Sequence, residues 1–329
     1  MKSKPYCLFP RTPYLFSSLN VQRDMLRDNL RLKRFKEAIF QTVRSGDVVI
    51  DLGTGTGILA IWAARAGAKR VFAIEETDVA AAAEAVVNKN GLQSIITVLR
   101  TNSTLVRLPE PADVLIAELV GHFLFEEGIV EYVSDVRNSL MKPGARIIPT
   151  HAGSFLAPIS LGRRFGEVSF WKKWRDPDLS VIAQLASNSL YVEELPKESL
   201  LADPQQVFNV DFLTVQPMTF RAEAAFEVKR HGRMDALGGW FNLFLTSKIL
   251  ISTAPGAPKT HWKQCVVPLD RPKRVVPGDV ITCQIAIEPF RPGAKWQWSV
   301  KFSGKGNHQE THEFTIMYDR DSRLLKERF

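Results

Sequence analysis

The sequence has few cysteines and no long apolar run, and these absences exclude several classes of protein. Cys7, Cys265 and Cys283 are an odd number without a CxxC pair, which argues against a disulfide framework and against a zinc site. No apolar run is long enough to span a bilayer, and Pro5 and Pro10 interrupt the N-terminus before a signal peptide could form. We therefore expect a cytoplasmic protein without a membrane partner or a bound metal, with a nuclear location possible in a eukaryote.

Signatures of nucleic-acid binding are also missing, although the chain is basic. It has 43 Lys and Arg against 35 Asp and Glu, a net charge of +8, and residues 1–40 hold nine basic and three acidic side chains. This excess fits a solvated helix face with a mobile tail, or else an anion or nucleic-acid contact. Because no RNA-binding signature or interleaving of aromatic and basic residues accompanies the charge, we expect no specific nucleic-acid partner.

What the sequence does contain is a globular composition, with 45% hydrophobic and 24% charged residues. In residues 1–149, expected strands alternate with expected helices. The strands are 48–52, 70–75, 96–100, 112–118 and 145–149, and the helices are 22–43, 58–67, 78–91 and 126–141. This alternation predicts a doubly wound, Rossmann-like α/β domain with a parallel sheet over residues 1–149.

The pattern changes after Pro149, where short alternating strands separated by turn residues replace the helical periodicity. The expected strands are 153–160, 206–213, 218–229, 240–248, 261–269, 279–289, 296–304 and 311–318. They predict an antiparallel barrel or sandwich over residues 150–329. An aromatic-rich stretch, residues 164–187, interrupts this rhythm and is interpreted as an insertion.

A glycine-rich loop, VVIDLGTGTGIL (48–59), connects the first expected strand to a helix. Its spacing is GxGxG rather than the GxGxxG of dinucleotide sites, and Asp51 lies just before the glycines. The second strand ends at Glu75, where a carboxylate can accept both hydroxyls of a ribose. An Asp before the glycines disfavours a phosphate and suits a cationic or phosphate-free nucleoside. Although a plain tight turn would also use glycines, the combination resembles class I methyltransferases that use S-adenosylmethionine (SAM).

Two acids flank the apolar stretch LIAELVGHFLFEEGIV (115–130), at the sheet edge where α/β domains bind ligands. Burying Glu118 and Glu127 together is costly unless a cation pairs with them. A guanidinium is planar and carries five donors, so it can satisfy two carboxylates at once. Alternatively, Glu126 and Glu127 only cap the helix that follows.

The second half adds the stretch THWKQ (260–264) at the end of a loop rich in proline and glycine. Together with AELVGHFLFEE (117–127), it resembles the protein arginine methyltransferase family, and the resemblance runs from end to end. RDMLRDNLR (23–31) resembles the N-terminal helix that closes over the cofactor, and FGEVSFWKKW (165–174) resembles the dimerisation arm. The resemblance implies a SAM-binding domain followed by an antiparallel β-barrel domain with a helical arm at about 164–187, and a homodimer formed through this arm.

The resemblance also assigns roles to residues. Glu118 and Glu127 would hold the target guanidinium, with Trp262 beside it, and Asp28 would pair with His261 to hold the N-terminal helix shut and accept or relay a proton. A pair of core aromatic side chains is the plainer reading of His261 and Trp262. The cofactor residues implied are Met25, Arg31, Asp51, Gly53, Gly55, Gly57, Glu75, Glu76, Ser103 and Thr104. Arg31 would meet the SAM carboxylate.

Several positions depart from the family pattern. The N-terminal aromatic motif is represented only by PYLFSSLN (13–20), and Gln22 replaces an expected His. The family has Trp-Met-Gly-Tyr after the first Glu, and this chain has Leu119, Val120, Gly121 and His122. Ser103 or Thr104 stands where an acid is expected near adenine. These positions shape the acceptor pocket and its lid, and so bear on the choice of acceptor and the number of methyl groups.

Three alternatives remain for function beside methylation of arginine in a protein or peptide. A basic protein repels basic substrates at long range, which leaves room for free arginine or another small guanidino acceptor. A methyltransferase-like scaffold without activity would fail to bind SAM. An RNA methyltransferase would bind RNA tightly and in a salt-sensitive way, but would not explain the second Glu.

Overall fold

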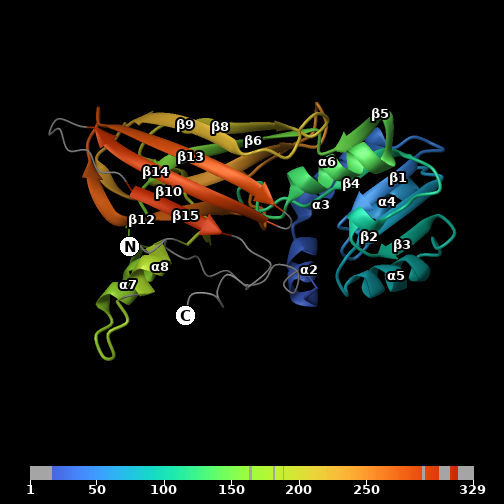
Figure 1. Ribbon diagram of the computed structural model, residues 1–329, viewed down its shortest axis with the longest axis horizontal. Helices are drawn as coiled ribbons and strands as arrows, with labels where there is room; N and C mark the ends of the chain where they lie inside the picture. Colours follow the sequence, from blue (N-terminus) through green and yellow to red (C-terminus); the bar gives the residue numbers. More distant parts are fainter. Residues whose placement is uncertain are drawn as a thin grey trace.

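The computed structural model describes residues 17–162, 165–180, 182–187, 189–290, 293–303 and 312–317. Figure 1 shows an α/β part beside a part built mainly of long antiparallel strands. None of the helices in the described ranges combines the length and hydrophobicity that a membrane crossing needs. Some features discussed from the sequence lie outside the described residues, namely Pro5, Cys7, Pro10, Arg164, Val181 and residues 13–16.

The α/β part is built on a five-stranded parallel sheet in the order β3-β2-β1-β4-β5. Its strands are β1 (Val48–Leu52), β2 (Arg70–Glu75), β3 (Ile96–Arg100), β4 (Ala112–Ala117) and β5 (Met141–Ile148). The connecting helices are α4 (Ile58–Arg65), α5 (Ala80–Lys89) and α6 (Ile129–Leu140), with the short η1 (Ser103–Leu105) after β3. Because the strand order turns back between β1 and β4, a crevice for ligands is expected at the carboxyl ends of these two strands.

The N-terminal helical region is the first correction to the sequence analysis, which predicts a single helix over residues 22–43. The chain forms α2 (Leu19–Leu26) and α3 (Asn29–Thr42) instead. Asp28 caps α3, because its side chain accepts the backbone N–H of Arg31 at 2.9 Å. The apolar spacing continues across the break, so periodicity alone does not reveal it.

The second part consists of two antiparallel sheets. One has the order β7-β12-β10-β6-β8 with β11 paired to β10, and the other has the order β15-β14-β13-β9. The first sheet contains β6 (His151–Ile159), β7 (Tyr191–Glu193), β8 (Gln205–Asp211), β10 (Gly232–Phe244), β11 (Leu250–Ser252) and β12 (Gln264–Val275). The second contains β9 (Phe220–Glu227), β13 (Val280–Phe290), β14 (Gly293–Ser303) and β15 (His312–Met317), and η3 (Lys197–Ser199) lies between β7 and β8. The expected fold class is confirmed in its parallel sheet and its antiparallel second part.

Strand β10 begins at Gly232 rather than at the expected Trp240, because glycine and aspartate are poor strand formers and hide its first half. The glycines are there for close packing. A Cβ on Gly239 would lie 2.7 Å from the ring of Phe123, and one on Gly238 would lie 2.9 Å from Leu195. The short strands β7 and β11 are also missed by the sequence analysis.

The arm contains α7 (Phe165–Lys173) and α8 (Ile182–Ser187), and it projects from the antiparallel part (Figure 1). Phe170 and Trp174 are 44% and 43% exposed, so the arm carries aromatic surface. Its base is held by the fully buried Asp235, which accepts the backbone N–H groups of Leu161 at 2.8 Å and Gly162 at 3.2 Å.

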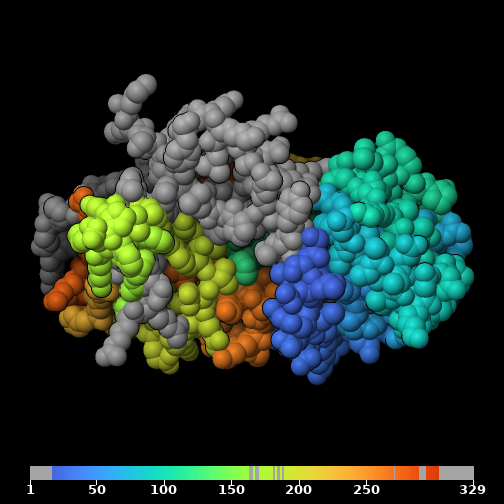
Figure 2. Space-filling view, turned by 90° about the horizontal axis from the view of Figure 1, so that it is seen from below, coloured from blue at the N-terminus to red at the C-terminus, as the bar shows by residue number. Residues whose placement is uncertain are grey.

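The N-terminal helices lie between the two parts. In Figure 2, the dark blue segment of α2 and α3 contacts the α/β part on one side and the orange chain of the antiparallel part on the other. Phe35, Ala38 and Ile39 of α3 are fully buried. These helices therefore cover the crevice at the carboxyl ends of the parallel strands.

Candidate functional site

A cavity of about 480 Å³ lies at the carboxyl ends of the parallel strands, beneath α2 and against the second part. Of the residues predicted from the sequence, Met25, Arg31, Gly53, Gly55, Glu75, Glu76, Ser103, Glu118, Glu127, His261 and Trp262 line this cavity. Asp28, Asp51, Gly57 and Thr104 do not contribute to its lining. The wall also includes Gln22, Leu119, Val120, His122, Glu126, Tyr132, Leu190, Val192 and Trp296. The structure thus brings residues from both halves of the chain into one enclosed space.

The glycine loop forms the floor of the cavity. Gly53, Gly55 and Gly57 have φ angles of 72°, 54° and 84°, a left-handed conformation that other residues rarely adopt. A Cβ on Gly55 would lie 2.9 Å from the amide oxygen of Gln22, and one on Gly53 would lie 2.6 Å from Leu119. The loop therefore needs glycine both for its turn and for the close approach of the cavity walls.

Asp51 lies beneath this loop and is fully buried. It accepts the hydroxyl of Thr54 at 2.5 Å and the backbone N–H of Ala60 at 2.9 Å. Burial raises the pKa of Asp51 to about 7, against the lowering effect of these two donors and with further raising by the charges of Glu75 and Glu118. Asp51 thus shapes the loop from behind, and its position gives it no contact with the cavity.

Glu75 ends β2 and points along the cavity floor. It accepts the backbone N–H groups of Gly55 at 3.0 Å and Thr77 at 2.9 Å. Glu76 accepts a hydrogen bond from the side chain of Asn102 at 2.7 Å. These bonds tie the ends of β1, β2 and β3 into one rigid rim.

Ser103 and Thr104 were both predicted near a nucleoside, and the structure separates them. Ser103 is 5% exposed and lines the cavity, and its hydroxyl has no partner among the described residues. Thr104 is exposed, and its hydroxyl donates to Asn102 at 2.9 Å. Of these two residues, only Ser103 therefore belongs to the cavity wall.

Arg31 enters the cavity from α3 and forms an ion pair with Glu118 at the end of β4. Its guanidinium also donates to the carbonyl oxygen of Met25 at 3.3 Å, and its buried Nε has no partner in the described part of the protein. The side chains of Arg31 and Glu118 are only 7% and 8% exposed. Arg31 thus neutralises part of the negative charge of the cavity that it lines.

The segment from Glu118 to Glu127 forms a hairpin closed by a β-bridge between Gly121 and Leu124. Leu124 has a φ of 86° and is fully buried, so packing holds a backbone conformation that is costly for leucine. The following helix α6 has Gly128 as its cap and no side-chain cap bond. The alternative that Glu126 and Glu127 cap this helix therefore has no hydrogen bond to support it, and both residues line the cavity.

The hairpin carboxyl groups are crowded. Burial raises the pKa of Glu127 well above its usual value, with further raising by the charges of Glu118 and Glu126 and a smaller lowering by Arg31. Burial also raises the pKa of Glu126 to about 7, although the backbone N–H of Phe123 donates to it at 2.8 Å. A cation placed between these groups would let them ionise.

Asp28 links α3 to the loop before β12. Its Oδ2 accepts the backbone N–H of His261 at 2.8 Å and lies 2.9 Å from the Nδ1 of the same residue. Burial tends to raise the pKa of Asp28, but the hydrogen bonds from His261 and Arg31 outweigh it and lower the pKa. The predicted pair is therefore in contact, although Asp28 itself stands behind His261 and away from the cavity.

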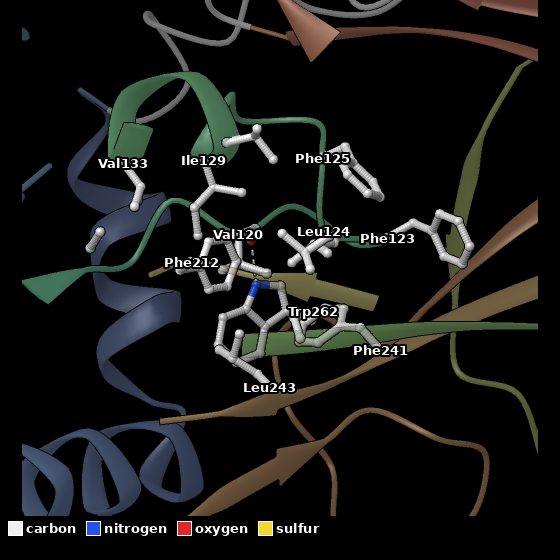
Figure 3. Packing of buried hydrophobic residues seen from close by; sticks show 14 of the residues in the cluster. Val120, Phe123, Leu124, Phe125, Ile129, Val133, Phe212, Phe241, Leu243 and Trp262 are labelled. Carbon is white, nitrogen blue, oxygen red and sulfur yellow. Dashed lines mark hydrogen bonds between the residues drawn. The ribbon is translucent and has the colours of Figure 1, made fainter. Parts of the chain in front are cut away.

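Trp262 follows His261 and is 2% exposed. Its indole N–H donates to the carbonyl oxygen of Val120 at 2.7 Å, shown as a dashed line in Figure 3, and its ring packs edge-on against Phe241. Figure 3 shows Leu124, Val120 and Phe212 around the same ring. Trp262 therefore fixes the hairpin to the second part and reaches the cavity with only part of its surface.

Two polar wall residues of the hairpin were not predicted as site residues. Glu126 was considered only as a cap, because neighbouring acids before a helix suggest one; its Oε2 is buried without a partner in the described residues. His122 was noted only as a departure, and its Nδ1 lies 2.7 Å from the carbonyl oxygen of Trp262. The signals that located this hairpin were two acids on either side of an apolar stretch and the resemblance to a family.

One wall of the cavity consists of rigid backbone and of acids that can bind the hydroxyls of a ribose. The second wall consists of the carboxyl groups of the hairpin, which have lone pairs that accept no hydrogen bond from the described residues. The second wall is suited to a planar cation with several N–H donors. The two walls meet in a single cavity, so two ligands can be held in contact with each other there.

Comparison with known protein families gives two matches that together span most of the chain. The family model described as an arginine methyltransferase oligomerization subdomain matches residues 150–304. The family model described as ribosomal protein L11 methyltransferase (PrmA) matches residues 35–149.

Individual relatives and structures agree with these matches. The protein arginine N-methyltransferase PRMT10 of Arabidopsis thaliana is 31% identical over 302 residues, covering 80% of this chain and 79% of the relative. Human protein arginine N-methyltransferase 2 is 31% identical, covering 83% and 67%. Among solved structures, a Trypanosoma brucei PRMT1 enzyme–prozyme heterotetrameric complex with AdoHcy has a TM-score of 0.83 at 26% identity, covering 92% of this chain and 99% of that chain.

Proposed function

The chain belongs to the protein arginine N-methyltransferase family, and from that premise we propose how its cavity performs SAM-dependent methylation of arginine in a protein or peptide. The observation that carries the proposal is the hairpin, where Glu118 and Glu127 line the same cavity as the glycine loop. A guanidinium bound to this hairpin would lie next to a ligand held by the loop.

The cavity residues fit SAM. The floor cannot accept side chains larger than glycine at Gly53 and Gly55, which suits close contact with a ligand. Glu75 at the end of β2 suits ribose hydroxyls, and Ser103 lines the same cavity. The positive charge of Arg31, which also lines the cavity, suits the carboxylate of the amino-acid tail. When bound, SAM supplies an electrophilic methyl group.

The hairpin would bind the arginine that accepts the methyl group. An arginine side chain is a cation with delocalised lone pairs, and it is a poor nucleophile. Glu118 and Glu127 would fix its guanidinium by charge-assisted hydrogen bonds, and they would draw positive charge away from the attacking nitrogen. Burial raises the pKa of Glu127, so binding of a cation would also favour its ionised form.

The lid is formed by α2 and α3. The bonds between Asp28 and His261 join α3 to the loop before β12, and Met25 of α2 lines the cavity. We propose that this pair holds the lid closed over the bound ligand, and that His261 accepts or relays the proton released after transfer.

We propose that the protein forms a homodimer through the arm. The exposed rings of Phe170 and Trp174 lie 5.5 Å apart at their centroids and form an aromatic surface. Such a surface is suited to burial against a partner. Sedimentation of the purified protein tests this, and a monodisperse monomer would contradict it. Absence of a specific nucleic-acid partner and a cytoplasmic location stay predictions, which RNA-binding assays and cell fractionation would test.

The function is tested by transfer of labelled methyl from SAM to three acceptors in parallel: an Arg/Gly-rich peptide, free L-arginine and a cell extract. We expect label on the arginine of the peptide, detected by mass spectrometry. Label on free arginine alone would redirect the assignment to a small guanidino acceptor, as the net charge of +8 would allow. Failure to bind SAM would support a scaffold without activity.

A further inference from the structure

His122 is a polar residue of the cavity wall whose role the glutamates do not explain. It lies on the hairpin between Glu118 and Glu127 and lines the cavity with them. Its Nδ1 is 2.7 Å from the backbone carbonyl oxygen of Trp262. A carbonyl oxygen only accepts hydrogen bonds, so Nδ1 must carry the proton.

The opposite ring nitrogen is then available. In a neutral imidazole with Nδ1 protonated, Nε2 holds a lone pair and acts as an acceptor. Within the described part of the protein, no group forms a hydrogen bond with this Nε2. Burial lowers the pKa of His122, and the electrostatic effects of His261 and Lys263 add to this lowering, although the hydrogen bond with the carbonyl oxygen of Trp262 acts in the opposite direction. The carboxyl groups of Glu118, Glu126 and Glu127 line the same cavity.

The donors of a guanidinium exceed what the two expected glutamates can satisfy. An arginine side chain has five N–H groups, whereas Glu118 already uses one oxygen for Arg31. Desolvating an N–H group without giving it an acceptor is costly. A neutral acceptor on the same hairpin would satisfy such a group without adding another negative charge to a crowded site.

We propose that His122 is a specificity-determining residue that accepts an N–H of the acceptor guanidinium through Nε2, with Trp262 fixing its tautomer. This inference rests on the proposed function. This chain has His122 where the family pattern has Tyr. The proposed hydrogen-bond acceptor therefore distinguishes this protein from the family pattern.

Two substitutions of His122 distinguish the role of Nδ1 from the role of Nε2. His122→Asn retains a donor near the position of Nδ1 and removes the acceptor at Nε2, whereas His122→Gln can place its amide oxygen near Nε2. With SAM and an Arg/Gly-rich peptide, we expect H122N to raise the KM for the peptide by about 10- to 100-fold. We expect H122Q to recover most of this loss, and the SAM Kd to change less than about two-fold in both variants. His231→Asn, at an exposed histidine between β9 and β10, is the matched control.

The outcomes are distinguishable. A peptide KM for H122N equal to that of the wild type overturns the inference. So does an equal loss in H122N and H122Q, or a parallel loss of SAM affinity, because each indicates a purely structural role in the hairpin. If the wild-type protein itself transfers no methyl to arginine, the proposed function fails before any variant is compared.

Discussion

The two walls of the cavity use their acidic residues differently. On the side of the glycine loop, Glu75 lies on the cavity wall and Asp51 lies behind it, and each accepts two hydrogen bonds from the residues of the loop and its surroundings. On the hairpin wall, Glu118 is paired with Arg31, and no described residue donates a hydrogen bond to Glu127. The first wall uses its carboxylates to hold the fold, whereas the second keeps lone pairs open to the cavity. A rigid wall suits a ligand without strong charge, and the open wall requires a cation.

The backbone shows the same contrast. The glycine loop adopts left-handed conformations at glycines, where they cost little. The hairpin and the loop that packs on it adopt them at Leu124 and Lys263, which are the non-glycine residues with positive φ in the described ranges. The acceptor wall therefore stores backbone strain that the cofactor wall avoids.

The largest expected effect tests whether the hairpin wall binds the arginine while the glycine-loop wall binds SAM. Glu127→Gln keeps the shape of the side chain and removes its charge, so kcat for the arginine peptide should fall by roughly 10²- to 10⁴-fold. The SAM Kd should change little, because Glu127 belongs to the other wall. Single-turnover kinetics and calorimetry measure the two quantities. Glu84→Gln, at an exposed position on α5, is the control, and equal losses in turnover and SAM binding would contradict the division.

The second prediction concerns the lid that spans both walls. If the hydrogen bonds between Asp28 and His261 hold α3 closed, the substitutions Asp28→Ala and His261→Ala should weaken SAM binding in a non-additive way. We expect a coupling free energy of about 1 to 3 kcal/mol in a double-mutant cycle. Additive losses of SAM affinity would mean that the two residues act independently, and that their contact does not close the lid.

These walls also differ in how far the sequence could predict them. Strands β1 to β4 of the parallel sheet were predicted to within one residue, because buried strands between glycine turns have a clear pattern, and Gly53, Gly55 and Glu75 followed from it. Strand β5 begins at Met141, four residues before the predicted start at 145. The break between α2 and α3 was missed, since the cap at Asp28 depends on a side-chain bond rather than on periodicity. The first half of β10 was missed because Gly238 and Gly239 serve close packing, Gly238 against Leu195 and Gly239 against Phe123 of the hairpin.

The hairpin itself shows where sequence reasoning stops. Glu118 and Glu127 were found by the resemblance to a family, and the structure places both in the cavity. Glu126 and His122 have no signal of their own, because their roles depend on contacts with Phe123 and Trp262. Asp51 illustrates the converse, since its position before the glycines predicted a ligand contact and the structure places it behind the loop.

The third prediction uses the raised pKa of Glu126 on the open wall. Burial raises this pKa from 4.5 to about 7, so between these values the folded protein holds a proton that the unfolded chain has lost. The free energy of unfolding contributed by Glu126 therefore falls as pH rises through this window. Glu126→Gln cannot titrate, yet it can still accept the N–H of Phe123.

We expect E126Q to gain stability relative to the wild type between pH 5 and pH 8, by about 1 to 3 kcal/mol. Urea unfolding at several pH values measures this difference. The exposed Glu84→Gln variant should keep a constant difference from the wild type over the same range. A constant difference for E126Q would mean that Glu126 ionises in the folded protein at no cost.

The smallest expected effect tests the strain on the acceptor wall. Lys263 is exposed, with a φ of 50°, directly after the buried Trp262. Lys263→Gly removes the steric cost of this conformation, but it also increases the entropy of the unfolded chain. We expect a net gain in the free energy of unfolding of about 0.5 to 1 kcal/mol, with kcat unchanged within about two-fold because Trp262 is fixed by Val120 and Phe241. A stable variant with a large loss of turnover would show instead that the strained backbone at Lys263 positions the acceptor wall.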